Sequence, residues 1–373
     1  MGISIAMSSK RTEWRAEDKA LPQVRTMHAY VPGKQPVGGD WIKLNTNELP
    51  YPASPAVAAA VAAEVEKLRL YPNPLSQPLR EHIAAMNGLL PEQVFVGNGC
   101  DEVLALLTRV FSDGRNIACM TQPSYSLYPV LTQIQAAQMQ KIPFARDMKL
   151  PVEAIRACTA NLLFLTNPNA PTGVEFAPED IRTAAEGFEG VFVIDETYAD
   201  FARHNAVAML AELPNIVITR SLSKSYGLAG LRLGYALASA QIVALLDKVR
   251  DSYNVNRLSQ AGALAALKDE AYHDELVATI KATRESFRDA LLARGFFAYP
   301  SSGNFVFAEP PARTGLSMTE AASSLFAYLE AKRILVRYFP GDALTESFLR
   351  ISIGRPEQMD RLLQTVDQWL SNE

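Results

Sequence analysis

The chain has 373 residues, of which 48% are hydrophobic and 20% charged, with 36 Lys and Arg against 40 Asp and Glu. This composition is typical of a globular protein, and the length predicts about two domains. The net charge of −4 gives no general reason to expect binding to nucleic acid or to an anionic membrane surface.

Cysteine and histidine give no indication of a metal site or a disulfide framework. The three cysteines and four histidines are scattered singly, without the ligand spacing of a zinc motif. No apolar run approaches the ~20 residues of a membrane-spanning helix, and residues 1–15 lack the architecture of a signal peptide. We therefore expect a cytoplasmic protein without a bound metal.

The predicted elements fall into three parts along the chain. Residues 1–50 are broken by Pro and Gly and are expected to form an arm or lid that joins the smaller domain. Residues 51–250 begin with a helix over 53–68 and then alternate β-rich runs with helical stretches. Strands are expected at 116–121, 162–166, 191–195 and 216–219, and helices at 101–111 and 179–187.

This alternation predicts an α/β fold whose large domain is a mainly parallel sheet sandwiched by helices. Residues 251–373 predict a smaller α+β domain on the substrate side. A helix is expected at 241–252, across the boundary near residue 250. The smaller domain is expected to have strands at 304–308, 334–338 and 348–353 and helices at 272–294 and 356–370.

Polar side chains follow the predicted strands, where parallel sheets place their functional residues. Asp195 closes an apolar run, and such an acid either faces a ligand or caps a helix. After the next strand come Ser221, Ser223, Lys224 and Arg232, in a glycine-rich loop that suits a phosphate group. The lysine is equally well explained as a surface residue.

Three further segments are weaker signals. Residues 97–102 place glycines before a helix, as in an anion site or an ordinary N-cap. Tyr125 lies just past a strand, and the proline-rich loop 167–173 follows another, although a simple turn explains that loop as well. Together the segments supply an acid, an aromatic plate, a phosphate cradle and a lysine, which match the parts of pyridoxal phosphate.

These motifs resemble those of the fold-type I aminotransferases, and among them the histidinol-phosphate aminotransferases. The resemblance runs from about residue 30 to the C-terminus, in the order of that family and nearly its spacing. It implies the fold-type I architecture and pyridoxal 5′-phosphate as the cofactor. It is carried by segments 44–48, 69–72, 99–102, 123–125, 167–173, 195–198, 221–224, 230–234 and 349–354.

The resemblance implies a role for each matching residue. Lys224 would bind the cofactor aldehyde covalently and move the substrate proton. Asp195 would keep the ring nitrogen protonated, and Tyr198 would hydrogen-bond the ring oxygen. Tyr125 would stack on the ring. The cofactor phosphate would be held by the backbone amides of Cys100 and Asp101 together with Ser221, Ser223 and Arg232.

Two features bear on whether this site is complete. Tyr71 would reach the cofactor phosphate from a neighbouring subunit, so the resemblance implies a homodimer with shared active sites. Family members commonly carry two adjacent asparagines before Pro-Thr-Gly, and the second position is Ala170 here. Either Asn169 takes over the contact with the ring oxygen, or Tyr198 makes it alone.

The substrate site implied by the resemblance is rich in arginine. Arg350 matches the arginine that binds the α-carboxylate of amino-acid substrates, and Arg337 matches a second arginine of the histidinol-phosphate enzymes. With Tyr30 from the arm, the pair would hold a substrate phosphate through bidentate bonds, and Asn47 would also bind the substrate. A surface charge on an edge strand is the plainer explanation of Arg337.

The implied reaction is transamination between histidinol phosphate and 2-oxoglutarate, a step of histidine synthesis. An aromatic amino-acid aminotransferase and a threonine-phosphate decarboxylase of the same fold would share every cofactor residue. A non-catalytic ligand sensor is a third alternative. Intact Lys224 and Asp195 oppose it, as does a net charge that disfavours binding to DNA.

Overall fold

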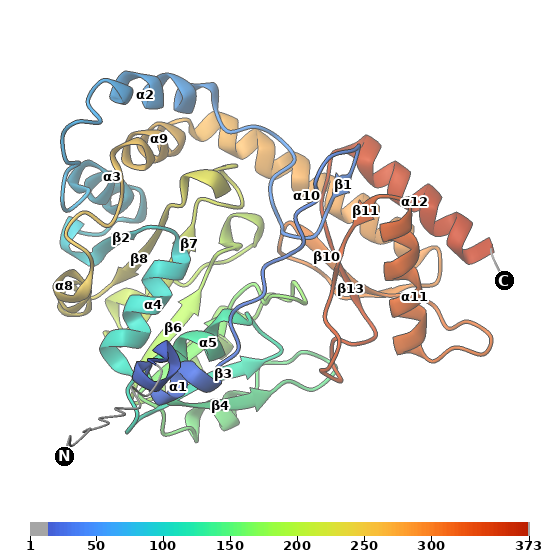
Figure 1. The fold of residues 1–373 in the computed structure, drawn as a ribbon, viewed down its shortest axis with the longest axis horizontal. Coiled ribbons are helices and arrows are strands. Elements are labelled where there is room, and N and C mark those ends of the chain that lie inside the picture. Colours follow the sequence, from blue (N-terminus) through green and yellow to red (C-terminus); the bar gives the residue numbers. More distant parts are fainter. Residues whose placement is uncertain (1–13, 372–373) are drawn as a thin grey trace, which may run out of the picture.

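The computed structural model describes residues 14–371, which form two units built on sheets (Figure 1). Residues 1–13 of the expected arm lie outside the described residues. The larger unit contains a seven-stranded sheet in the order β2-β8-β7-β6-β5-β3-β4. Its strands are β2 (Val94–Gly97), β3 (Ile117–Gln122), β4 (Gln138–Pro143), β5 (Leu162–Thr166), β6 (Val191–Asp195), β7 (Ile216–Ser221) and β8 (Gly234–Ala238).

The large sheet is mainly parallel, as predicted. The pairs from β7 through β4 are parallel, whereas β8 runs antiparallel to both β2 and β7. Successive residues of a strand point to opposite faces, and Leu162 and Phe164 belong to one core while Leu163 and Leu165 belong to another. Both faces of the sheet are therefore buried, which explains why its central strands are continuous apolar runs.

Helices cover the two faces of this sheet (Figure 1). Their starts follow local rules: Ser54 caps α2 with its side chain, and proline occupies the first positions of α2, α3 and α7. The helices of this unit are α2 (Pro55–Val65), α3 (Gln77–Asn87), α4 (Cys100–Phe111), α5 (Leu127–Ile134), α6 (Val152–Arg156), α7 (Pro178–Glu186), α8 (Ala240–Val249) and α9 (Arg257–Lys268).

The smaller unit is an antiparallel sheet in the order β12-β13-β10-β9, covered by three helices. Its apolar core includes Phe305, Leu325 and Leu362, one from the sheet and two from the helices that cover it. The strands are β9 (Phe297–Ala298), β10 (Phe305–Glu309), β12 (Arg337–Tyr338) and β13 (Leu349–Ser352), and the helices are α10 (Glu270–Leu292), α11 (Met318–Ala331) and α12 (Pro356–Ser371).

The strand expected over 334–338 is split between two sheets. β11 (Ile334–Leu335) pairs in parallel with β1 (Ile42–Lys43) of the arm, and only β12 joins the four-stranded sheet. Ile334 and Leu335 are buried, so the apolar pattern persists through the change of partner. Periodicity alone therefore predicts one continuous strand where the fold makes two.

The N-terminal arm contacts both units. Its helix α1 (Pro22–Thr26) lies beside α5, where Gln23 Nε2 donates to the Ile134 carbonyl at 3.3 Å. The chain then crosses to the smaller unit and forms β1 (Figure 1). Leu44, just after β1, is buried in the core of that unit. The arm thus spans the junction at which the two units meet.

Helix α9 packs on α2 and belongs to the larger unit. Its residues Ala263 and Leu267 lie in the core beside the large sheet, whereas Ile280 and Phe287 of α10 lie in the core of the smaller unit. We propose that the domain boundary lies near the start of α10, about twenty residues beyond the boundary expected near residue 250. Within residues 14–371, no helix combines the length and apolarity needed to cross a bilayer.

Candidate active site

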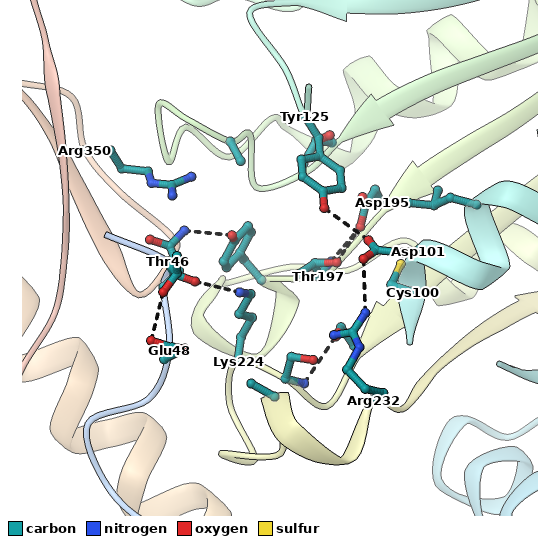
Figure 2. Close-up of a pocket in the computed structure, with 18 residues that line it drawn as sticks. Thr46, Glu48, Cys100, Asp101, Tyr125, Asp195, Thr197, Lys224, Arg232 and Arg350 are labelled. Atoms are coloured by element: carbon teal, nitrogen blue, oxygen red, sulfur yellow. Dashed lines mark hydrogen bonds and ion pairs between the residues drawn. The ribbon is translucent and has the colours of Figure 1, made fainter. Parts of the chain in front are cut away.

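A cavity of about 330 Å³ lies where the carboxyl ends of the central strands meet the arm and the smaller unit (Figure 2). Strand register places Asp195 of β6 between Thr166 of β5 and Thr219 of β7. The cavity brings together most of the residues predicted from the sequence. These are Asn47, Cys100, Asp101, Tyr125, Asp195, Tyr198, Ser221, Ser223, Lys224, Arg232 and Arg350.

Asp195 is a buried acid whose two oxygens are fixed by hydroxyl groups. Thr197 Oγ1 donates to Oδ1 at 2.7 Å, and Tyr128 OH donates to Oδ2 at 2.7 Å. Burial raises the pKa of Asp195, and these hydrogen bonds oppose that rise only in part. A cationic group next to this carboxylate would favour its ionised form. The site therefore suits a ligand that presents a positive N–H.

Lys224 presents its amine in the same cavity. Its Nζ donates to the Thr46 carbonyl at 3.0 Å (Figure 2). Burial and the positive charge of Arg350 lower the pKa of Lys224 to about 8, against the opposing attraction of Glu48. At pH 7 an amine with this pKa is roughly one-tenth neutral, whereas an ordinary lysine is neutral in well under a thousandth of molecules. Lys224 is therefore available as a nucleophile near neutral pH.

The N-terminus of α4 opens onto the cavity and is suited to an anion. Its N-cap is Gly99, which supplies no side-chain cap for the first amides of the helix. Gly234 of β8 lies so close that a Cβ there would come within 2.3 Å of the Cys100 nitrogen. Arg232 stands over the same end, with Nη2 3.1 Å from Asp101 Oδ2. Two nearby hydroxyl groups, those of Ser221 and Ser223, also line the cavity.

Two tyrosines of the cavity are held at their hydroxyl groups. Tyr125 donates to Asp101 Oδ1 at 3.1 Å, and Tyr198 accepts from Asn47 Nδ2 at 2.8 Å. Asn47 is itself held by Ser352, whose hydroxyl donates to Asn47 Oδ1 at 2.8 Å. Burial raises the pKa of Tyr198, so this phenol stays protonated at neutral pH.

A second cavity of about 500 Å³ adjoins the first and shares Tyr125, Ala170 and Arg350 with it. Its lining also includes Tyr30 and Arg337, the remaining predicted substrate residues. Arg337 and Arg350 are direct partners across β12 and β13. Within the described chain Arg350 donates to the Asn45 carbonyl at 3.0 Å, while its buried Nε has no partner.

The pair of arginines creates a local excess of positive charge. Burial lowers the pKa of Arg350, and the charge of Arg337 lowers it further. Arg337 lies beside the arm, with Nη2 3.3 Å from the Val31 carbonyl. Within the described residues neither arginine forms an ion pair with a carboxylate, and two such guanidinium groups favour a doubly charged anion.

Two predicted residues, Asn169 and Tyr71, line neither of the two cavities. Asn169 is buried, and its side chain holds the loop after β5: Nδ2 donates to the Pro123 carbonyl at 3.0 Å and Oδ1 accepts from Thr172. Tyr71 is 77% exposed and stacks on Tyr253 with ring centroids 4.4 Å apart. It therefore lies on the surface of this chain.

Four residues of the site escape sequence reasoning. The Thr46 carbonyl and Glu48 come from the irregular arm, where no periodicity indicates a contact with Lys224. Thr197 lies two residues after Asp195, where the side chain of Asp commonly accepts from the backbone amide, as it does here at 3.2 Å, so Thr197 could have been found. Tyr128 lies in the apolar pattern of α5 and gives no such signal.

Comparison with known proteins agrees with this geometry. Residues 39–366 match the family described as aminotransferase class I and II. The chain is 42% identical to the histidinol-phosphate aminotransferase of Geotalea daltonii, over 92% of this chain and 97% of that protein. It is 41% identical to the Synechocystis protein of the same name, over 92% of this chain and 96% of the other.

The fold is also found among solved structures. The crystal structure of histidinol-phosphate aminotransferase from Sinorhizobium meliloti in complex with pyridoxal-5′-phosphate superposes with a TM-score of 0.83 at 24% identity. That match covers 98% of this chain and all of the other. The agreement in fold, together with the sequence match over most of the chain, shows that this protein belongs to the class I and II aminotransferases.

Proposed function

We propose that this chain transfers an amino group between histidinol phosphate and 2-oxoglutarate with pyridoxal 5′-phosphate as its cofactor. The observation that carries the proposal is the joining of two cavities through Arg350. One cavity holds Lys224 and Asp195, and the other holds Arg337. This arrangement suits a cofactor beside a phosphorylated amine.

The residues of the first cavity fit the cofactor group by group. Asp195 matches the ring nitrogen, and the uncapped start of α4 with Arg232 matches the phosphate. Tyr125 offers an aromatic face, and the Tyr198 hydroxyl, fixed by Asn47, matches the ring oxygen. When bound, the cofactor supplies an electron sink for the carbon that loses its proton.

The catalytic steps of this chain are proton transfers and orientation. Lys224 has an amine near neutral pKa, which suits it to take a proton from the substrate carbon and return it. Asp195, whose two oxygens are fixed by Thr197 and Tyr128, would stabilise a positive charge on the ring nitrogen of the bound cofactor. Asn169 has no part in this proposal beyond holding its loop, and Tyr198 makes the ring-oxygen contact alone.

The second cavity favours a phosphorylated substrate, such as histidinol phosphate, over phenylalanine. Arg337 and Arg350 stand side by side without a carboxylate partner in the described chain, as a phosphate dianion requires. The carboxylate of phenylalanine carries one negative charge and needs only one guanidinium. Tyr30, whose ring lies 6.0 Å from that of Tyr125, closes the cavity from the arm.

The proposal includes a homodimer in which Tyr71 completes the partner's cofactor site. Two contacts fix the position of Tyr71 on the surface. Its ring stacks on Tyr253, and Arg257 Nη2 donates to its carbonyl at 2.7 Å. Leu68 and Leu70 next to it are exposed as well. An ordered tyrosine among exposed leucines is typical of a surface that another subunit covers.

A half-reaction titration tests the proposed function. The cofactor-loaded protein is mixed with histidinol phosphate, phenylalanine or phosphothreonine, and the cofactor absorbance is followed to the pyridoxamine form. We expect conversion at the lowest concentration with histidinol phosphate, and no conversion by Lys224→Ala. Arg337→Lys should raise the concentration needed about tenfold, because a bidentate contact worth about 1.4 kcal/mol is lost.

Arg115→Lys provides the matched control, because Arg115 is exposed and pairs only with Asp113 in the described chain. Release of carbon dioxide from phosphothreonine would instead identify the decarboxylase. Conversion by phenylalanine alone would identify an aromatic aminotransferase and contradict the proposal.

A further inference from the structure

The loop that carries Lys224 is connected to α10 through a polar cluster outside the two cavities. Ser225, which directly follows Lys224, donates a hydrogen bond to Asp200 Oδ2. His273, on the first turn of α10, places Nε2 3.6 Å from the same carboxylate oxygen. Ser225 is only 2% exposed, so its hydrogen bond is shielded from water.

The same cluster touches the other catalytic segment. Asp200 lies in the short 3-10 helix η3 (Ala199–Phe201), two residues after Tyr198. The Asp200–Ser225 hydrogen bond therefore joins the segment that presents Tyr198 to the segment that presents Lys224. The His273 ring is fixed by stacking on Tyr226, with centroids 4.1 Å apart and 19° between the planes.

We infer that His273 is a positioning residue for Lys224, acting through Asp200 and Ser225. The inference rests on the proposed function, in which Lys224 is the catalytic amine. Protonated His273 attracts the Asp200 carboxylate, which fixes the Ser225 hydroxyl and the backbone from which Lys224 extends. Because α10 begins beside the larger unit and continues into the smaller one, this pair also links the lysine loop to the junction between them.

The attraction depends on the charge of His273. Burial lowers the pKa of this ring, but the carboxylates of Asp200 and, to a smaller extent, Asp274 together outweigh that effect and hold the pKa above its usual value. The contribution of the pair is therefore complete at acidic pH and is lost as the pH rises through the raised pKa. The titratable and charged groups around the pair are Asp269, Asp274, Tyr226 and Tyr272 beside His273, and Glu196, Arg220 and Tyr235 beyond Asp200.

Steady-state kinetics of the holoenzyme between pH 6 and 9 test this inference. We expect His273→Asn and Ser225→Ala each to lower kcat about tenfold at pH 6.5, as a small displacement of the amine does, with KM changed by less than about twofold. The deficit of His273→Asn should shrink toward pH 9, where the wild-type ring is neutral. The double variant should be no slower than the slower single variant, because both substitutions break the same chain of contacts from His273 through Asp200 to Ser225.

His204→Asn is the matched control, since His204 lies at the surface beside Glu175 and outside both cavities. An unchanged kcat, a deficit that does not vary with pH, or additive losses in the double variant would overturn the inference. Ser225→Ala removes one hydroxyl and keeps the test decisive if His273→Asn fails to fold. Measurements on the wild-type protein distinguish failure of this inference from failure of the proposed function. If the wild type does not bind the cofactor or does not turn over histidinol phosphate, the proposed function itself is contradicted.

Discussion

The pKa values of the residues in this site are set by burial and by the charges of neighbouring side chains. Lys224 sits between Arg350, which lowers its pKa, and Glu48, which raises it. Glu48 is held ionised: burial raises its pKa, but hydrogen bonds from Lys43 and Thr46 outweigh that effect and leave it below its usual value. The amine is thus adjusted by groups from two segments that lie far from it in the sequence, the arm and β13.

This balance predicts the pH dependence of cofactor attachment. Only the neutral amine attacks an aldehyde, so the rate at which the apoprotein takes up pyridoxal phosphate should rise with pH and level off above about 8. Glu48→Gln removes a charge that raises the pKa of Lys224, and the midpoint should move to lower pH. Stopped-flow absorbance measures the rate.

Glu66→Gln is the control, because Glu66 is exposed at the end of α2. A midpoint near 10 in the wild type would contradict the lowered pKa. A shift to higher pH in Glu48→Gln would show that Glu48 acts in some other way.

Sequence reasoning at this scale groups residues whose chemistry lies in a local motif. Asp195 and Lys224 follow predicted strands, and the structure brings both to one cavity. Tyr128 also bonds Asp195, but its helix looks like any other buried amphipathic helix. Its hydroxyl meets the acid only because α5 packs against the sheet.

At the scale of elements, the proposed anion site depends on how closely β8 approaches α4. Gly234 stands opposite Gly97 in the β2–β8 pair and lies against the first turn of α4. The absence of a side chain leaves the Cys100 amide in place and free to face the cavity. Gly234, a strand residue, thus allows the first turn of α4 to pack closely against the sheet.

Gly234→Ala should weaken cofactor binding. Its Cβ would stand 2.3 Å from the Cys100 nitrogen, so the backbone must move. The backbone amides at the start of α4 would then no longer point toward the cofactor phosphate. Overpacking of this kind costs roughly 1–3 kcal/mol, and we expect the Kd for pyridoxal phosphate to rise about tenfold or more. Equilibrium dialysis measures the Kd.

Gly230→Ala is a matched control in the same loop region, because a Cβ at Gly230 has nothing within 4 Å. Equal affinities of the two variants would show that the close approach does not shape the phosphate site. Thermal unfolding of both separates a local effect from loss of the fold.

At the scale of the whole molecule, the mild net charge of −4 conceals a local reversal. Lys224, Arg232, Arg337 and Arg350 line two joined cavities at the junction of the units. The exposed segment around Tyr71 lies elsewhere on the surface, and neither cavity includes it. The proposed dimer connects these features by bringing one subunit's Tyr71 to the other's phosphate site.

Tyr71→Phe tests this connection. A hydrogen bond to a charged group contributes about 1.5–3 kcal/mol, so the Kd for pyridoxal phosphate should rise about tenfold or more while the protein remains a dimer in analytical ultracentrifugation. Tyr253→Phe controls for the stacked ring next to it and should bind normally. Unchanged affinity in Tyr71→Phe would count against a shared site.

The sequence by itself determined the order of elements and the acid, lysine and phosphate-binding motifs, because each depends on neighbours a few residues away. The carboxyl ends of parallel strands lie at the same edge of a sheet, so the sequence alone is enough to group the side chains that follow those strands. Only the tertiary structure showed that the arm contacts Lys224, that β11 pairs with β1 instead of joining the four-stranded sheet, and that α9 packs on α2. These contacts join segments more than a hundred residues apart, and their energies come from packing that local periodicity does not encode.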